Sequence, residues 1–513
     1  MSNLPFCTAV GSGRFAALLN QTSDALYGVK APGLERLADD KFHLLVEGGK
    51  WKGCWSQNYY GMICTTPLLS GKLLDYHLHT LEIFFEYQGD GKTADENGFT
   101  APPGALPEYV SLYKGFTCPR YKNDEGSGLA GEFDFWVEGN AASVASVCDV
   151  LLAMRNREKS ALLLPKIEKC LEFILSRKDP ATGLLKVGVA GTLIERAYGA
   201  TFRSKGVTEY GLPAGAAANT IYALRLAAEV EEFAGNMSRK EFYLKEAEAL
   251  QKALAQLIEK DSCLINYLDA DGIRHGVPGA SRHGYFETNC NHDAAAWGVI
   301  PERVAVRALK EILDFSPTPL APCVWKIHDD THWSYQQPGD EAYGGAGAHW
   351  NGAAWFSSQG RYIYALLKYG LFDGACAAGE AMQAIYDSGT MRDLLIDWGE
   401  SCMGKENPDA EGVYYIDGFG AFGGVLRGVA GVEYKSHSVK LSPHLPAEMS
   451  SYKQLRPYYW GGKELFMQVE GTGTQVCEVL VNGKAVPGSL TGNSVLLEWD
   501  SLPEKAEILF KRV

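Results

Sequence analysis

The chain has 513 residues, of which 46% are hydrophobic and 21% charged, a composition typical of a folded globular protein. Its 48 lysines and arginines against 62 acidic residues give a formal net charge of −14. This acidity disfavours binding to a nucleic-acid backbone or an anionic membrane. We expect neither a membrane span, because no run approaches about 18 apolar residues, nor a signal peptide, because the N-terminus lacks a basic region followed by an apolar one.

The twelve cysteines are too sparse for a disulfide scaffold, and no two form a Cys-x-x-Cys pair. We therefore expect buried thiols and a reducing, cytoplasmic location.

The first four-fifths of the chain is predicted to be helical. Apolar residues recur at steps of three and four in 164–174, which is typical of one buried helix face. The same pattern predicts helices around 221–228, 243–257 and 363–367, and Gly370 is placed to end the last of these in a left-handed cap. Long segments rich in glycine, proline and aromatic residues lie between the helices, at 89–107, 199–215, 269–291 and 317–347. Such segments on a helical scaffold tend to carry function.

After about Val432 the pattern changes to alternation of apolar and polar residues. This period of two predicts strands within 465–470, 477–481, 494–499 and 506–510, with Asn482-Gly483 as a hairpin turn. The C-terminal part is therefore predicted to be a small antiparallel β domain that packs on the helical domain.

Several catalytic motifs are absent from the sequence, namely the phosphate loop GxxxxGK[ST], GxGxxG after a strand, HExxH and GxSxG. What the sequence offers is carboxylates set among aromatic rings and glycines. Sugars are bound by this mixture, because rings stack on apolar sugar faces and carboxylates bind hydroxyls. Glycosidic cleavage also needs two carboxyl groups, one to protonate the leaving oxygen and one to activate water or attack.

Two acidic segments lie in the first half of the chain. Asp134, Trp136 and Glu138 lie in GEFDFWVEGN, where the acids either favour a helix N-terminus or bind sugar hydroxyls beside a stacking ring. Glu195 follows Ile194 in a glycine-rich segment, where it is either half of an ion pair or a partly buried general acid with a raised pKa. Glu209 is the local alternative for that acid.

Three more segments follow in the second half. In YFETNCNHD at 285–293, helix capping or substrate contact is expected, since the spacing of Cys290, His292 and Asp293 is not a metal-ligand pattern. An aromatic stretch holds Trp333, His349, Trp350 and Trp355, which line either a core or a sugar-binding cleft. Glu400 and Glu406 precede a glycine-rich helix start, where one of them could be a catalytic base.

The order of these segments resembles the six-hairpin (α/α)6-barrel glycosidases, especially α-L-rhamnosidases and the amylo-α-1,6-glucosidase or debranching group. The resemblance rests on WVEGNA from Trp136, DPATGLL at 179–185, AAANTIYALRLAAEV at 216–230, HWNGAAWFSSQGRYIYALLKYG at 349–370, and DGFGAFGGVLRGVAGV at 417–432 followed by LSPHLP and strands. This sequence departs from the families at three places: Glu195 stands near the position of an aspartate after Trp-Met, Gly399 separates Glu400 from the preceding tryptophan, and Asn58 replaces a common aspartate.

The resemblance implies a mainly α fold, with an (α/α)6-barrel domain over residues 1–432 and a β domain over 433–513. It implies an exo-acting, inverting glycoside hydrolase that releases a monosaccharide of the α-L-rhamnoside or α-glucoside class and needs no cofactor or metal. Glu195 would protonate the leaving oxygen, and Glu400, or Glu406 in its place, would activate water. The pocket would be lined by Asp134, Trp136, Glu138, Trp333, His349, Trp350 and Trp355.

Three other functions stay open. A sugar epimerase on the same barrel would use His292 and His349 as acid and base, and a phosphorylase would require phosphate. A non-catalytic carbohydrate-binding protein would fit the Asn58 departure. The sugar, its anomer and the oligomeric state are left open by the sequence.

Overall fold

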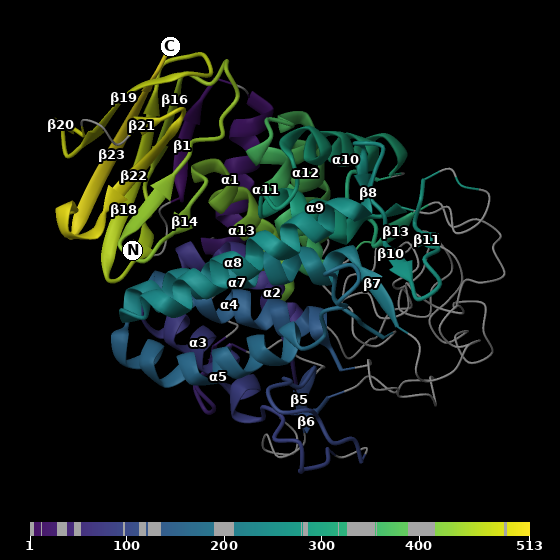
Figure 1. Ribbon diagram of the computed structural model, residues 1–513. Coiled ribbons are helices and arrows are strands. Elements are labelled where there is room, and N and C mark those ends of the chain that lie inside the picture. Colours follow the sequence, from purple (N-terminus) through teal and green to yellow (C-terminus); the bar gives the residue numbers. More distant parts are fainter. Residues whose placement is uncertain are drawn as a thin grey trace.

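In the computed structural model, a helical body forms most of the molecule and a β region lies on one side of it (Figure 1). The structure describes residues 5–11, 13–27, 38–45, 53–95, 98–111, 119–121, 135–188, 210–278, 280, 286–316, 318–325, 354, 356–387, 416–486 and 490–513. The described helices are α1 (Gly13–Tyr27), α2 (Ser56–Gly61), η2 (Met62–Leu68), α3 (Gly71–Glu86), α4 (Val137–Met154), α5 (Arg157–Leu175), α7 (Ala214–Ala234), α8 (Met237–Leu254), α9 (Thr288–Ala296), α10 (Glu302–Phe315), α11 (Phe356–Lys368), α12 (Phe372–Asp387) and α13 (Ile416–Ala430).

Six of these helices contact one another in a closed order. Helix α2 contacts α4, α4 contacts α7, α7 contacts α9, α9 contacts α11, α11 contacts α13, and α13 contacts α2 and its continuation η2. We call these the inner helices. The remaining helices pack against them: α3 and α5 against α4, α8 against α7, α10 against α9, α12 against α11, and α1 against α13.

Composition separates the inner from the outer helices. Almost every residue of α4 and α7 is buried, which suits their small and apolar sequences. Outer helices such as α10 bury one stripe only, with Val304, Ala308 and Ile312 inward and charged residues outward. Among the described residues α4 also has the length and apolar composition of a membrane span, contrary to the expectation from the sequence, and 94% of that window is buried inside the protein.

The glycines of α13 allow it to approach its neighbours closely. A Cβ atom at Gly420 would lie 2.1 Å from the carbonyl oxygen of Gly61, and one at Gly424 would lie 2.1 Å from that of Gly360. Any side chain at these positions would push α13 away from the end of α2 and from α11. The glycine-rich sequence after 417 therefore serves helix packing, a role that the sequence pattern alone did not separate from catalysis.

The β region consists of two sheets. The first has the order β1-β16-β18-β23-β19-β20 with β17 paired to β18, and the second the order β14-β15-β22-β21. Their strands are β1 (Cys7–Val10), β14 (Glu433–Tyr434), β15 (Ser438–Leu441), β16 (Ser451–Gln454), β17 (Tyr458–Trp460), β18 (Lys463–Glu470), β19 (Val476–Val481), β20 (Lys484–Ala485), β21 (Leu490–Thr491), β22 (Ser494–Glu498) and β23 (Lys505–Arg512). All described pairings in these two sheets are antiparallel except β18 with β23, which is parallel.

Small sheets lie in the segments that lead into inner helices. One is β4 (Gly53–Trp55), β5 (Tyr109–Ser111) and β6 (Pro119–Arg120), another is β7 (Gly211–Pro213), β10 (Tyr267–Asp269) and β11 (Arg274–His275), and a third is β12 (Phe286–Glu287) with β13 (Val324–Trp325). Two further pairs are β2 (Ala38–Asp39) with β3 (Leu44–Leu45) and β8 (Ile258–Glu259) with β9 (Cys263–Leu264). Strands β4, β7 and β12 run directly into α2, α7 and α9.

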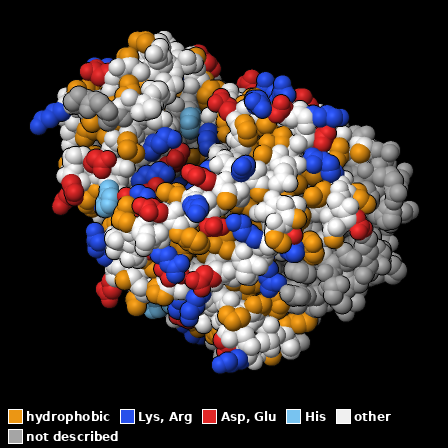
Figure 2. Space-filling view, viewed as in Figure 1, with side chains coloured by type: hydrophobic (Ala, Val, Ile, Leu, Met, Phe, Trp, Pro, Cys, Tyr) orange, Lys and Arg blue, Asp and Glu red, His pale blue; other side chains and the backbone are white. Residues whose placement is uncertain are grey.

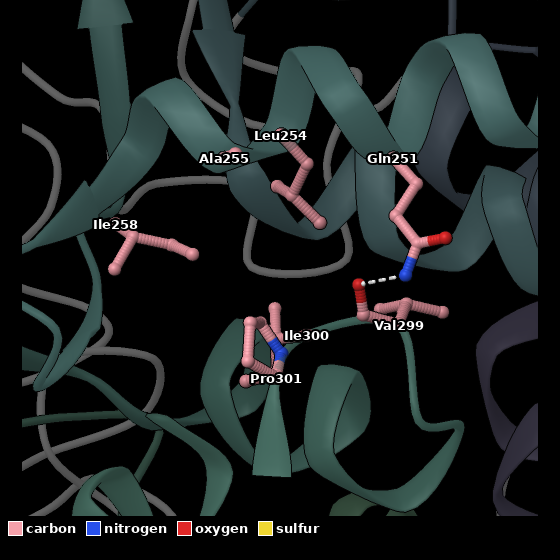
Figure 3. Close-up of a pocket in the computed structure, with 7 residues that line it drawn as sticks. All are labelled: Gln251, Leu254, Ala255, Ile258, Val299, Ile300 and Pro301. Atoms are coloured by element: carbon pink, nitrogen blue, oxygen red, sulfur yellow. Dashed lines mark hydrogen bonds between the residues drawn. The ribbon is translucent and has the colours of Figure 1, made fainter. Parts of the chain in front are cut away.

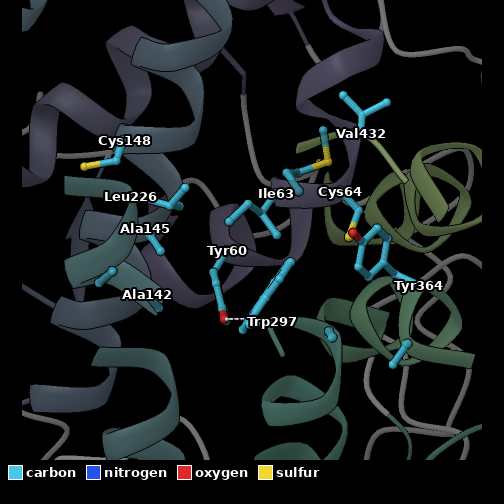
Figure 4. Packing of buried hydrophobic residues seen from close by; sticks show 14 of the residues in the cluster. Tyr60, Ile63, Cys64, Ala142, Ala145, Cys148, Leu226, Trp297, Tyr364 and Val432 are labelled. Carbon is cyan, nitrogen blue, oxygen red and sulfur yellow. Dashed lines mark hydrogen bonds between the residues drawn. The ribbon is translucent and has the colours of Figure 1, made fainter. Parts of the chain in front are cut away.

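The elements predicted from periodicity are confirmed. The helices around 164–174, 221–228, 243–257 and 363–367 are α5, α7, α8 and α11, and Gly370 follows α11 with a φ of +70°. The β region packs on the helical body as expected, because β17 contacts α4 and η2. Buried apolar residues of both parts form one continuous core, part of which Figure 4 shows around Tyr60, Trp297 and Val432. All ten cysteines in the described part of the chain are free, and nine of them are buried.

Candidate functional site

The connections between helices differ sharply in length at the two ends of the inner helices. Long segments precede each inner helix: 28–55, 87–136, 176–213, 255–287, 316–355 and 388–415. The connections that leave them are short, for example 155–156 after α4 and 235–236 after α7. We call the N-terminal halves of the inner helices the entry end and their C-terminal halves the exit end. In Figure 1 the strands β7, β10, β11 and β13 lie together beside the entry end.

Most of the predicted site residues lie outside the described residues. These are Asp134, Glu195, Glu209, Trp333, His349, Trp350, Trp355, Glu400 and Glu406. Their roles stay predictions. By sequence position, each of them falls in one of the long segments that lead into an inner helix.

Trp136 and Glu138 are the predicted residues that the structure does describe. Trp136 is the residue before α4, and its ring is buried against Gly139, where a Cβ atom would lie 2.2 Å from the ring. Glu138 lies in the first turn of α4, where a negative charge is favoured by the helix dipole, and is only 5% exposed. The structure therefore holds both residues in the protein interior at the entry end.

The carboxylate of Glu138 is held by the neighbouring helix α7. The side-chain amide of Asn219 donates a hydrogen bond to Glu138 Oε1 over 3.1 Å. Gly215 also lies beside this carboxylate, since a Cβ atom at this position would be 2.3 Å from the same oxygen. The first turn of α7 can approach this carboxylate because residue 215 has no side chain.

Asn219 is in turn bound by a tyrosine from a third inner helix. Tyr60 of α2 donates its hydroxyl proton to Asn219 Oδ1 over 2.7 Å, and the same hydroxyl oxygen accepts a hydrogen bond from Trp297 Nε1, also over 2.7 Å. The side chains of Tyr60 and Asn219 are buried. Four residues that are far apart in the sequence are thus joined in one chain of hydrogen bonds.

A buried ion pair lies on the other side of Tyr60. Arg361 Nε of α11 donates to Asp293 Oδ1 of α9 over 2.7 Å, and the guanidinium lies 4.2 Å from the centroid of the Tyr60 ring. Burial alone would raise the pKa of Asp293, but the charge of Arg361 holds it below its usual value. The pair is therefore ionised at neutral pH.

His292 lies beside this ion pair. Its Nδ1 is 2.9 Å from Asp293 Oδ1, and its Nε2 is 2.9 Å from Asn289 Oδ1. Burial lowers the pKa of His292 in spite of the nearby carboxylate. The ring of His292 is fully buried, so this histidine is not exposed as the acid or base of an epimerase would be.

Glu287 caps α9, which confirms one of the two roles expected for this segment. Its two carboxylate oxygens accept hydrogen bonds from the backbone N–H groups of Asn289 (2.7 Å) and Cys290 (2.8 Å). Burial raises the pKa of Glu287 to about 7, although these hydrogen bonds act in the opposite direction. In the described part of the chain no group of three or more histidine, cysteine or acidic side chains could hold a metal ion.

A cavity of about 240 Å³ lies away from this cluster, between the end of α8 and the start of α10 (Figure 3). Its lining is apolar apart from Gln251, whose amide donates to the carbonyl of Val299 and accepts from Arg225. A cavity with these walls lacks the carboxylates and open amides that bind sugar hydroxyls. On the face of the molecule in Figure 2, acidic and basic side chains are interspersed.

Sequence reasoning missed Tyr60, Asn219, Trp297 and Arg361. The sequence did contain a signal for Asn219. This polar residue follows three alanines in a segment of mostly small and apolar residues that is predicted to be a helix. A polar side chain in such a buried helix must find a partner. Arg361 gives a similar signal among the apolar residues of α11. Nothing in the sequence showed that these residues meet.

Comparison with solved structures finds a similar fold in a rhamnosidase and in a protein named sialidase. A GH78 family rhamnosidase of Bacillus sp. GL1 is similar with a TM-score of 0.56 and 15% sequence identity, over 91% of this chain and 42% of the rhamnosidase. A protein named sialidase is similar with a TM-score of 0.53 and 11% identity, over 97% of this chain and 42% of its own length. A rhamnosidase from Klebsiella oxytoca with rhamnose bound has a TM-score of 0.48 and 14% identity, over 83% of this chain and 66% of its own.

This chain spans about two fifths of the length of the first two proteins. At these identities the likeness establishes the fold alone. No family model matches the chain. No curated protein sequence matches it significantly.

Proposed function

We propose that the protein is an exo-acting glycoside hydrolase that releases a monosaccharide of the α-L-rhamnoside or α-glucoside class and inverts the anomeric configuration. The observation that carries the proposal is the arrangement of acids on this fold: Glu138 and Glu287 lie near the entry end, and the segments with Glu195, Glu400 and Glu406 lead into the same ends of α7 and α13. The closed order of contacts among the inner helices supports an (α/α)6 barrel, which we propose lies within residues 1–432, with the β domain at 433–513. Strand β1 (Cys7–Val10) is an exception to the boundary expected from the sequence, because it pairs with β16 in the β region.

The proposed reaction uses two carboxyl groups. Glu195 donates its proton to the glycosidic oxygen as the bond from that oxygen to the anomeric carbon breaks. Glu400, or Glu406 in its place, takes a proton from the water that attacks the opposite face of the sugar. Inversion requires room for this water, with the two carboxyl groups about 6.5–9.5 Å apart. Asp134 and Glu138 bind hydroxyls, and no cofactor takes part.

Sugar release from a panel of glycosides tests the proposal. The panel contains aryl α-L-rhamnosides, α-glucosides, β-glucosides and uronides, each with and without phosphate, and proton NMR identifies the first anomer formed. We expect one monosaccharide to be released without phosphate and with inverted configuration. Release that requires phosphate would indicate a phosphorylase, and a mass-neutral change of a free sugar would indicate an epimerase.

Substitution of the acids tests the assignment of roles. Glu195→Gln and Glu400→Gln are each expected to lower kcat at least 100-fold, since general acid or base catalysis contributes about 100- to 10,000-fold. Glu406→Gln is the matched control and is expected to keep its activity. If Glu406 is the base, the expected results for the Glu400 and Glu406 variants are reversed. Full activity in both the Glu195 and the Glu400 variants would overturn the assignment.

A further inference from the structure

We propose that Tyr60 and Asn219 are positioning residues that fix Glu138 as a hydrogen-bond acceptor for a sugar hydroxyl at the entry end. This inference rests on the proposed function and adds two residues to it. Neither residue needs to touch the substrate, because both act through the carboxylate of Glu138.

The direction of the hydrogen bonds is set at Trp297. An indole N–H can only donate, so the hydroxyl oxygen of Tyr60 is the acceptor in the bond that Figure 4 shows between these residues. The hydroxyl proton of Tyr60 is then directed to Asn219 Oδ1. Since the oxygen of the Asn219 amide faces Tyr60, its NH₂ group faces Glu138.

This order of donors makes Glu138 an acceptor at Oε1. The bond from the Asn219 amide is stronger to an ionised carboxylate than to a neutral carboxyl group. An ionised carboxylate accepts hydrogen bonds from sugar hydroxyls, and such charge-assisted bonds are stronger than those between neutral groups.

The surroundings hold the chain of hydrogen bonds in place. Tyr60 and Asn219 are shielded from water, so their bonds do not compete with solvent. The backbone of Gly215 packs so close to Glu138 Oε1 that there is no room for a Cβ atom between them, which limits the movement of the carboxylate. Tyr60 itself is held by the Arg361 guanidinium over its ring.

Tyr60→Phe tests the proposal by removal of one hydroxyl group. Without it Asn219 loses its fixed orientation, and Glu138 loses a fixed donor. We expect KM for the released glycoside to rise about 10-fold with kcat changed less than twofold, because uniform binding is lost. Tyr243→Phe is the matched control, since Tyr243 is also a fully buried tyrosine but lies on the outer helix α8. An unchanged KM in Tyr60→Phe, or an equal rise in the control, would overturn the proposal.

Asn219→Asp tests the direction of the bonds through the pH profile. The variant places a second carboxyl group against Glu138, and two facing carboxyl groups share one proton. While that proton is held, the introduced carboxyl group donates to Glu138 as the amide did. We expect KM near the wild-type value at low pH and a rise as the shared proton is lost, a limb that the wild type lacks.

Among the described residues, the other charged or titratable groups near Glu138 are Tyr60 on α2, Arg361 on α11, and Glu287, Cys290, His292 and Asp293 at α9, and they are the same in both proteins. An Asn219→Asp profile parallel to that of the wild type would count against the positioning role, because a purely structural residue would not change it. Wild-type protein that releases no sugar from any glycoside would instead refute the proposed function, so the two failures are distinguishable.

Discussion

The two ends of the inner helices have opposite designs. At the exit end the β region covers the helices and bonds to their last carbonyl groups: Trp460 Nε1 donates to Leu152, the backbone N–H of Gly461 donates to Ala153, and Tyr458 donates to Leu426. The bonds to Leu152 and Ala153 satisfy carbonyls that the end of α4 leaves without helical partners, whereas Leu426 lies about one turn before the end of α13. At the entry end the long segments arrive, and buried acids and amides are joined to one another instead.

This contrast assigns different tasks to the two ends of the same helices: the exit end contributes to stability, and the entry end also carries the residues proposed for activity. The exit end joins two regions of the chain through bonds to helix carbonyls, donated by the Trp460 and Tyr458 side chains and by the backbone of Gly461. The entry end depends on particular side chains, Glu138 and Asn219 among them, and on the absence of one at Gly215. We expect substitutions at the exit end to change stability alone, and those at the entry end to change stability and activity together.

Removal of one arginine from each end gives the largest expected effect. Arg427 makes two 2.8 Å bonds to Asp149 at the exit end, and Arg361 pairs with Asp293 near the entry end. Arg427→Met and Arg361→Met each leave a buried carboxylate without its charge partner, which costs about 3–5 kcal/mol. Urea unfolding measures the loss.

The activity of the two arginine variants sharpens the comparison. Arg427→Met is expected to keep the wild-type KM in its folded fraction, whereas Arg361→Met is expected to raise it through Tyr60. The double variant Arg427→Met with Asp149→Leu should regain most of the lost stability, because it leaves no buried charge. Equal effects of both arginine variants on KM would contradict the division between the two ends.

Glu287 gives the next effect, through pH. Its pKa is raised by burial to about 7 in the folded protein, against about 4.3 when unfolded. The folded state therefore binds more protons, and the contribution of Glu287 to stability is complete below about pH 4.3 and is lost as pH rises through 7. The difference amounts to about 3–4 kcal/mol.

Unfolding of wild type and Glu287→Gln at pH 5 and pH 8 measures this contribution. The wild type should lose about 2–3 kcal/mol more than the variant between these pH values, since part of the window lies below pH 5. Glu231→Gln is an informative companion, because burial also raises the pKa of Glu231 to about 7, and it lies in the exit half of α7. Parallel pH profiles for wild type and Glu287→Gln would contradict the expectation.

Arg155→Ala is expected to have a smaller effect, at the joint between the helical body and the β region. The Arg155 guanidinium lies 4.9 Å from the ring centroids of Phe233 and Trp460 and 4.5 Å from that of Trp499. Loss of these contacts should lower the free energy of unfolding by about 2 kcal/mol. The variant Arg14→Ala, which breaks an exposed ion pair, is the control and should change it by less than about 1 kcal/mol. Equal stability of both variants would refute this role of Arg155.

Asn156→Ala is expected to have the smallest effect. Asn156 lies in the short connection after α4, and its side chain accepts a hydrogen bond from the backbone N–H of Lys159 at the start of α5. Loss of such a cap costs about 1 kcal/mol. Thermal unfolding and sugar release should show a small fall in stability with no change in kcat or KM; a changed KM would be evidence against the division between the ends.

Sequence periodicity predicted the elements that stand on local pattern. The stripe in 243–257 gave α8, and Asn482-Gly483 gave the turn between β19 and β20, because both depend on residues close in the chain. Strand β1 was missed, since its partner β16 lies at the far end of the sequence. The parallel pairing of β18 with β23 was missed for the same reason.

Sequence reasoning named one residue of the buried hydrogen-bonded chain, Glu138, from its setting among aromatic residues, and its role in sugar binding stays a prediction. The cap by Glu287 was one of two roles foreseen for its segment. The contact of Tyr60 with Asn219 and Trp297 joins three helices, and no local pattern encodes it. The sequence shows which buried polar residues require hydrogen-bond partners, but the packing of the helices determines which partners they contact.

Strand β1 also gives the chain an order of assembly. The ribosome delivers Cys7–Val10 long before Ser451–Gln454, so β1 stays without its partner while the residues between them are synthesised. The Phe6 ring also lacks its contact with Tyr458 until that residue has been synthesised. Completion of β16 therefore closes the chain on itself, and a shortened chain that ends before 451 would expose an unpaired strand edge to other molecules.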